Sequence, residues 1–476
     1  MTDSISPITM LPTELLTVIF VYCLPEEQDV WFEGPDLLHA PLLTASVCRL
    51  WREVVLQAPL LWRTISFGGR NYDPRSEAAK AKYIDMFATR SGTHPLRMYA
   101  NLDRRHRDCV RRLFQNVPRC EHLKVHLPPD LRVKGLLPTS PGPLLKTLVL
   151  TERTKSSFLN FESGSPSEDI DLSFATGIEN LFLCGGAFSR LCVDTVSWTQ
   201  LTSLKLESVT SEASALRVVA RCTALKSCAL SFACEGDANS TEVLAGEDHL
   251  ELLELEDLCL GSPMDCGRGD FEEIAKRLTA PKLKRLELIA PCVRVHIGSP
   301  TAWISMIQRS HASVHHLELQ TGYCPFATFE GLMDVLSEMP DLETLSIKNQ
   351  IMQSGDPFDG RAQDFLQALT RPFSDEGGQV QDTLALPSLS RLAIRAPLNL
   401  KDPAAFESVE RMLRSRCQGR PGSGNNSVYP NCALREAAVI FMGSDQKTKW
   451  DLSNWGTLRL ESKSKVCNLP VEFWID

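Results

Sequence analysis

A short pattern of apolar positions recurs along most of the chain. Two leucine-like residues stand three positions apart and a third follows two positions later, as in Leu145-x-x-Leu148-x-Leu150. The alternation in its second half is typical of a strand with one buried face, because successive strand side chains point to opposite faces. The middle residues of the copies are Leu123, Leu148, Leu181, Leu204, Cys228, Leu253, Leu286, Leu317, Leu345 and Leu392, and a degraded copy begins at Leu434.

Helical patterns separate many of these copies. They cover residues 215–222, 270–278, 302–309, 329–339, 362–369 and 406–416. An irregular strand is also expected at residues 94–99 and a basic amphipathic helix at 104–117. Short parallel strands that alternate with helices stack so that each strand–helix pair covers its neighbour. The predicted fold class is therefore α/β, with a curved parallel sheet backed by helices.

The N-terminal residues follow a different pattern. Residues 11–24 are apolar on every side of a helix, and residues 42–58 place Val47, Trp51 and Val55 at helical spacing. So small a group of helices buries too little surface to hide this many apolar side chains. We therefore expect either a protein partner or the rest of the chain to cover them.

Composition and charge exclude several classes of protein. Of the 476 residues, 43% are hydrophobic and 23% are charged, as in folded chains. The net charge of -9 argues against a dedicated binder of nucleic acid or of an anionic membrane. The 16 cysteines form no CxxC pair and are expected to be reduced. Residues 15–24 have the length of a signal-peptide core, but no basic residue precedes them, so we expect a cytoplasmic or nuclear protein.

Catalytic and metal-binding patterns find little support. The sequence has no P-loop, no H-E-x-x-H and no G-x-S-x-G motif. His311, His315 and His316 are close in sequence, but they bring no cysteine or carboxylate at ligand spacing. We expect no enzymatic activity, no metal and no cofactor. A hydrolase with a site in the inserted loops is the remote alternative.

The N-terminal residues resemble the F-box, whose usual pattern is Leu-Pro-x-Glu-hydrophobic, later Val-Cys-x-x-Trp and a final Leu-Trp. The matching residues are Leu11, Pro12, Glu14, Leu15, Val47, Cys48, Trp51, Leu61 and Trp62. The long acidic segment at 26–41 departs from that pattern. Several neighbouring copies of the leucine pattern stand 23 to 25 residues apart, which is similar to the period of leucine-rich repeats. The chain as a whole resembles an F-box/leucine-rich-repeat protein.

The resemblance implies a substrate-recognition subunit of an SCF (Skp/cullin/F-box) ubiquitin ligase. Residues 9–67 would be the F-box, 68–119 a helical connector that could include an irregular first repeat, 120–449 a leucine-rich-repeat solenoid and 450–476 a C-terminal cap. The F-box would bind the Skp adaptor of the cullin-based ligase, and the solenoid would bind a protein substrate. The residues expected to bind the adaptor are Leu11, Pro12, Glu14, Leu15, Ile19, Phe20, Val47, Cys48, Trp51 and Trp62. The alternative is an interaction scaffold that is not coupled to ubiquitination.

Polar residues that alternate with the buried leucines would face the substrate. The residues expected on that face include Lys205, Arg285, His316 and Lys348. Those expected to bind the substrate are Glu254, Glu256, Glu287, Glu318, Arg391 and Arg395. We expect a substrate segment with basic residues against the four glutamates and an acidic group near the two arginines. The alternative is a solvated charged face that binds nothing, because charge runs are usually of that kind.

Overall fold

The computed structural model describes residues 7–24, 40–67, 77–101, 107–127, 140–152, 170–185, 191–209, 212–232, 249–261, 271–290, 297–321, 329–349, 386–396 and 436–441, with a few single residues between them. The chain divides into two compact units, Met1–Val209 and Thr210–Asp476. Both units contain parallel strands and helices, so the predicted α/β class is confirmed. Among the described residues, no helix has the length and apolarity needed to cross a membrane.

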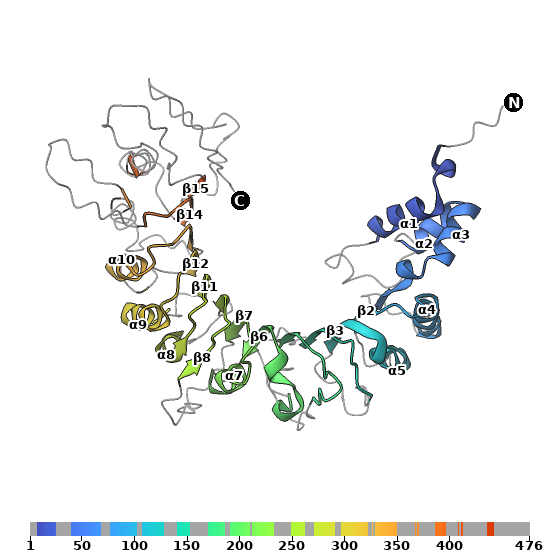
Figure 1. The fold of residues 1–476 in the computed structure, drawn as a ribbon, viewed down its shortest axis with the longest axis horizontal. Coiled ribbons are helices and arrows are strands. Elements are labelled where there is room, and N and C mark those ends of the chain that lie inside the picture. Colours follow the sequence, from blue (N-terminus) through green and yellow to red (C-terminus); the bar gives the residue numbers. More distant parts are fainter. Residues whose placement is uncertain are drawn as a thin grey trace, which may run out of the picture. The chain divides into compact units, whose positions relative to one another are not determined.

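Short helices open the first unit (Figure 1). They are η1 (Pro7–Met10), α1 (Thr13–Tyr22), α2 (Leu42–Val47), α3 (Arg49–Gln57) and η3 (Pro59–Trp62). Pro12 is the N-cap of α1, where its missing N–H breaks no helical hydrogen bond. The single helix predicted over residues 42–58 is wrong, because Cys48 has extended backbone angles, with φ -155° and ψ 173°, and separates α2 from α3.

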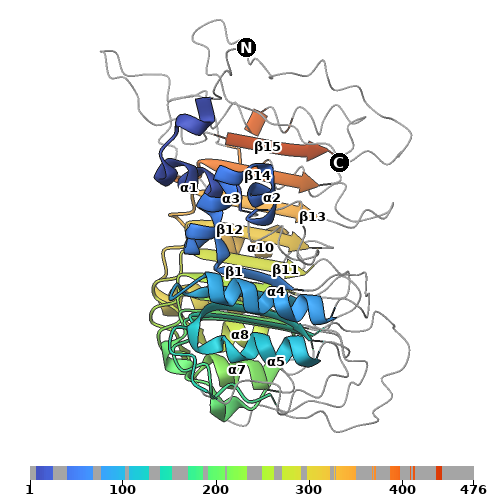
Figure 2. The same ribbon diagram turned by 90° about the vertical axis from the view of Figure 1, so that its right-hand side faces the viewer.

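A parallel sheet forms the rest of the first unit. Its strands follow chain order: β1 (Thr64–Phe67), β2 (Leu96–Asn101), β3 (Cys120–Leu127), β4 (Thr147–Glu152), β5 (Asn180–Cys184) and β6 (Ser203–Val209). Helices α4 (Glu77–Arg90) and α5 (Arg107–Gln115) lie against each other, as Figure 2 shows, and each joins one strand to the next. Such crossovers are what a parallel sheet requires. Short 3-10 helices η5 (Val117–Arg119), η6 (Val193–Thr195) and η7 (Trp198–Gln200) complete the unit.

The second unit repeats this organisation. Its main sheet has the order β7 (Ser227–Phe232), β9 (Asp257–Gly261), β11 (Arg285–Ala290), β12 (His316–Thr321), β13 (Thr344–Asn349), β14 (Arg391–Ala396) and β15 (Glu436–Phe441). The described helices are α7 (Glu212–Val219), α8 (Phe271–Arg277), α9 (Pro300–Ser310) and α10 (Phe329–Ser337). Helices α9 and α10 lie on one side of strands β11 and β12 (Figure 1), which leaves the other face of these strands without a described helix.

The recurring leucines form the core of the second unit. Leu286, Leu317, Leu345 and Leu392 are partners in successive strands and are at most 2% exposed. Buried side chains of the helices, such as Trp303 of α9, complete this core. The strands are therefore held in register by their apolar residues, since a shift by one position would turn every leucine to the other face.

One predicted strand is misplaced. The sequence pattern placed it at Leu250-x-x-Leu253-x-Leu255, but Leu253 is 55% exposed. The strand of the main sheet is β9, which uses the overlapping frame Leu255-x-x-Leu258-x-Leu260, and all three of these leucines are buried. Residues 250–251 instead form β8, which pairs with β10 (Leu278–Thr279) in a separate small sheet.

Most other predicted elements are present. The strands expected at residues 94–99 and after Leu434 are β2 and β15, and the helix expected at 104–117 is α5. The helices expected at 215–222, 270–278, 302–309 and 329–339 correspond to α7, α8, α9 and α10 with shifted ends. The helices expected at 362–369 and 406–416 lie outside the described residues except for a few single positions, and the C-terminal cap at 450–476 lies entirely outside them.

Candidate functional site

Large apolar side chains are exposed on the N-terminal helices. Leu15 and Val18 of α1 are each 51% exposed, and Val47 of α2 is 57% exposed. Nine of the eleven exposed large apolar residues in the described part of the chain lie between residues 8 and 56. We call them the N-terminal apolar surface: Ile8, Met10, Leu15, Val18, Ile19, Tyr22, Leu43, Val47 and Leu56. Leu15, Val18, Ile19 and Tyr22 are spaced so that they lie on one side of α1, and an exposed apolar patch of this kind indicates an interaction site.

A packed core supports this surface from beneath. Leu16 and Phe20 of α1 are buried, and the Phe20 ring packs against Trp51 of α3 with ring centroids 4.9 Å apart. The indole N–H of Trp62 donates to the carbonyl of Val55 at 2.8 Å. These contacts fix the helices to one another, so the exposed side chains belong to an ordered structure.

Trp62 also joins the N-terminal helices to the following helix. Its ring packs edge-on against Phe87 of α4, with centroids 4.9 Å apart, and the Arg90 guanidinium lies 4.4 Å from the indole centroid. A cation over an indole face is an attractive arrangement. The helices that carry the apolar surface are thereby anchored to the first parallel sheet, since α4 contacts β1.

The residues predicted to bind the adaptor fall into three groups. Exposed positions are Pro12, Glu14, Leu15, Ile19 and Val47, and half-buried positions are Leu11, Cys48 and Trp51. Phe20 and Trp62 are buried, at 1% and 0% exposure. These two residues are therefore corrected from partner contacts to core residues, because a buried ring cannot meet a partner unless the helices separate.

Cys48 has a structural role that the motif alone does not give. It is the N-cap of α3, and its Sγ accepts the backbone N–H of Trp51 at 3.4 Å. Side-chain acceptors at this position satisfy one of the free N–H groups at a helix start. The Cys-x-x-Trp part of the motif thus corresponds to the cap and first turn of α3.

The six residues predicted to bind substrate do not form one acidic surface. Glu287 and Glu318 are partners in β11 and β12, on the side chains that alternate with buried leucines. Glu254 and Glu256 lie before β9 and not on a strand, because the strand uses the later leucine frame. Arg391 is exposed at the start of β14. Arg395 lies in the same strand opposite Lys348, but its side chain lies outside the described part of the structure.

The four glutamates are already paired with cations of the same chain. Lys282 donates to Glu254 and Lys284 to Glu256, each at 2.7 Å, and the bond from Lys284 lowers the pKa of the Glu256 carboxyl. Arg285 Nε donates to Glu287 and Lys348 Nζ to Glu318, again at 2.7 Å. The predicted attraction of a basic substrate segment by free glutamates is therefore not supported by this arrangement.

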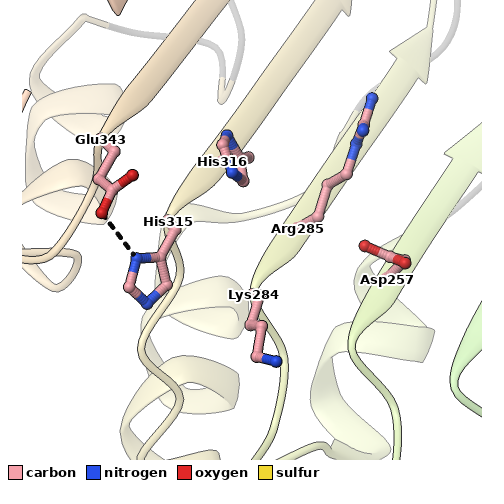
Figure 3. A pocket seen from close by; sticks show the side chains of 6 residues that line it. All are labelled: Asp257, Lys284, Arg285, His315, His316 and Glu343. Carbon is pink, nitrogen blue, oxygen red and sulfur yellow. Dashed lines mark hydrogen bonds and ion pairs between the residues drawn. The ribbon is translucent and has the colours of Figure 1, made fainter. Parts of the chain in front are cut away.

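A polar hollow of about 470 Å³ lies where several strands of the second unit begin (Figure 3). We call it the strand-start hollow, and its lining residues are Asp257, Lys284, Arg285, His315, His316 and Glu343. Register brings these residues together, because Asp257 pairs with Arg285, Arg285 with His316 and His316 with Thr344. His315 Nδ1 lies 3.4 Å from a carboxylate oxygen of Glu343.

Sequence reasoning found only part of this hollow. Arg285 and His316 stood among the residues expected on the sheet face, but Asp257 was hidden by the wrong frame for β9. Lys284, His315 and Glu343 each precede a strand by one residue, and a strand pattern alone does not show that this position faces a hollow. A comparison of the copies would have revealed them, because the residue just before the strand is charged or a histidine in four neighbouring copies. These residues are Glu256, Lys284, His315 and Glu343.

Comparison with known proteins adds no relative. No protein-family model matches the chain, and no curated protein matches it.

Proposed function

We propose that the chain is a substrate-recognition subunit of an SCF-type ubiquitin ligase. Residues 9–67 would form an F-box that binds the Skp adaptor, and residues 120–449 a leucine-rich-repeat solenoid that binds a target protein. The observation that carries the proposal is the N-terminal apolar surface, which is exposed on helices whose other sides are packed. The motif order from Leu11 to Trp62 supports the same assignment.

The surface has the chemistry of a helix-docking site. Leu15 and Ile19 are four residues apart on α1, so they lie on one side of that helix. Apolar side chains with this spacing insert into hydrophobic grooves of partner proteins. Pro12 and Val47 add exposed apolar contacts from the ends of α1 and α2. A few such residues usually provide most of the binding free energy.

The repeated strands support the second half of the proposal. Each described strand of the second unit pairs in parallel with its neighbours, and equivalent leucines are aligned and buried. Helices α9 and α10 lie on one side of the strands. Short strands backed by helices with an open opposite face are typical of repeat proteins that bind other proteins.

Such a subunit would act by proximity and would need no catalytic residue. Binding adaptor and target together raises the local concentration of the target near the ubiquitin-conjugating enzyme. An interaction scaffold without a ligase would have the same target-binding sheet but no affinity for the adaptor. The measurement that separates the two is therefore adaptor binding.

The test compares adaptor binding by the full chain and by a Leu15→Ala/Ile19→Ala/Val47→Ala variant. We expect the intact chain to form a stable complex with purified Skp adaptor. The variant should bind at least about 100-fold more weakly, because hot-spot side chains contribute about 2 kcal/mol or more each. Biolayer interferometry with immobilised adaptor measures both affinities.

A Leu144→Ala/Leu253→Ala variant is the matched control. Both leucines are exposed and apolar but lie outside the N-terminal apolar surface. This variant should bind the adaptor like the intact chain. If the intact chain forms no complex, or if both variants bind equally well, the assignment to a ligase is wrong.

A further inference from the structure

Two cations line the strand-start hollow, and each forms an ion pair with a carboxylate of the same chain. Arg285 is 52% exposed while its partner Glu287 is 20% exposed, and Lys284 is 57% exposed while Glu256 is 37% exposed. In both ion pairs the cation therefore stands further into solvent than the carboxylate. A ligand in the hollow therefore reaches the Arg285 guanidinium and the Lys284 ammonium, and it also reaches the exposed carboxylates of Asp257 and Glu343.

These cations retain unused hydrogen-bond donors. A guanidinium has five N–H donors and an ammonium has three, and neither can accept a hydrogen bond. The Nε and one terminal nitrogen of Arg285 interact with the Glu287 carboxylate, and the Lys284 ammonium donates one hydrogen bond to Glu256. The remaining N–H groups lie beside the hollow, where a ligand with anionic oxygens could accept them.

His316 completes the group of donors. It is exposed at the start of β12, next to Arg285 in the register, and within the described part of the chain its imidazole has no hydrogen bond or ion pair. A neutral imidazole offers one N–H donor and a protonated imidazole offers two. Arg285 and His316 are thus donors at paired positions of neighbouring strands, whose backbones lie about 4.8 Å apart.

The carboxylates of the hollow lie at its two sides. Figure 3 shows Asp257 of β9 and Glu343 before β13 flanking the four basic side chains of β11, β12 and the residues before them. An anionic group held between Arg285 and His316 would be one strand away from Asp257. The flanking carboxylates could accept backbone N–H groups or basic side chains on either side of that anionic group.

We propose that the strand-start hollow binds an anionic side chain, a carboxylate or a phosphate, in a segment of the target protein. Arg285, His316 and Lys284 would donate to its oxygens. This inference rests on the proposed function, because the segment would belong to the protein that the ligase recognises. The volume of about 470 Å³ lies in the range of pockets that hold a ligand and far exceeds that of one water.

The test uses three degenerate peptide pools with phosphoserine, glutamate or serine fixed at the centre. Each pool is passed over the immobilised full chain, and the retained peptide is quantified by mass spectrometry. We expect the phosphoserine or glutamate pool to be retained about tenfold more than the serine pool, as charge-assisted hydrogen bonds predict. The comparison of the two anionic pools distinguishes phosphate from carboxylate.

Charge reversal identifies the site. Arg285→Glu and His316→Glu should each abolish the preference for anionic peptides, whereas Arg111→Glu should preserve it. Arg111 is an exposed cation of α5 in the first unit, so its reversal makes the same change in net charge as Arg285→Glu. Equal retention of all three pools, or a preference that survives both reversals at the hollow, would overturn the proposal.

The outcome is separable from that of the adaptor experiment. Peptide retention is measured without adaptor, and the reversed residues lie outside the N-terminal apolar surface. If the chain binds the adaptor but shows no preference for anionic peptides, the proposal of an anion site in the strand-start hollow is wrong and the assignment to a ligase stands. If the chain prefers anionic peptides but does not bind the adaptor, the assignment to a ligase is wrong and the hollow is a binding site of an interaction scaffold.

Discussion

Gly298 and Glu272 together fix the turn that leads into α9. Glu272 accepts the backbone N–H of Ser299 at 3.0 Å and the ammonium of Lys276 at 2.9 Å, and these bonds lower the pKa of its carboxyl. Gly298 has a φ of 102°, a conformation that side chains rarely allow. A Cβ at this position would lie 2.7 Å from the Cβ of Glu272. Only glycine therefore fits between α8 and the start of α9.

Gly298→Ala should destabilise the second unit by about 1–3 kcal/mol, because the substitution adds both backbone strain and a clash. The midpoint of urea unfolding, followed by circular dichroism, measures the loss. Gly261→Ala is the control, since a Cβ there would have its nearest neighbours at 3.7 Å and the backbone needs no positive φ. Similar losses in both variants would contradict this account of the turn.

At the scale of elements, local pattern predicts most strands but cannot choose between overlapping frames. The segment from Leu250 to Leu260 fits the leucine pattern twice, and the periodicity is equally good in both fits. The choice is made by pairing, because β9 must align Leu258 with Cys228 of β7 and Leu286 of β11. Strand pairing is a non-local property that one segment does not contain.

Leu258→Ala should therefore cost about 2–5 kcal/mol of unfolding free energy, as large-to-small substitutions in a core do. Leu253→Ala should change it by no more than about 0.5 kcal/mol, because Leu253 is exposed. Thermal unfolding of the two variants makes the comparison. A larger loss of unfolding free energy for Leu253→Ala than for Leu258→Ala would instead favour a strand in the frame Leu250-x-x-Leu253-x-Leu255.

The N-terminal helices show a second limit of pattern. The order of the motif residues is visible in the sequence. The sequence does not show which of these residues are exposed and which are buried. Helix α1 is apolar on every side, so its periodicity does not tell Ile19, which is exposed, from Phe20, which is buried. The burial of Phe20 depends on Trp51, whose position follows from the break at Cys48. Strand β1 was missed for a related reason, since four residues are too few to show alternation.

At the scale of the whole chain, the described cysteines range from fully buried through half-buried to exposed. Cys109, Cys120, Cys222 and Cys228 are buried, whereas Cys23 is exposed at the end of α1. Burial raises the pKa of the Cys222 thiol to about 12. A thiol with so high a pKa has almost no reactive thiolate at neutral pH. Both compact units contain such protected thiols, so they report on the integrity of each unit.

Iodoacetamide at pH 8 should alkylate Cys23 rapidly in the native protein. Cys222 and Cys228 should react at least about 100-fold more slowly, because burial limits both access and ionisation. Peptide mass spectrometry after timed quenching gives the rate for each cysteine. In urea the rates should converge. Rapid native alkylation of Cys228 would show that the core of the second unit is not packed as described.

The in-register strands of the second unit impose a spatial period on anything that lies across them. Equivalent side chains of adjacent strands are about 4.8 Å apart, whereas side chains on one side of an extended peptide recur about every 6.7 Å. The two periods come back into phase after about three strands, or four peptide residues. Arg285 of β11 and Arg391 of β14 are three strands apart. In an extended segment that crosses the sheet, residues i and i+4 would thus lie opposite equivalent positions of β11 and β14. The residues between them would not be aligned with a strand in this way.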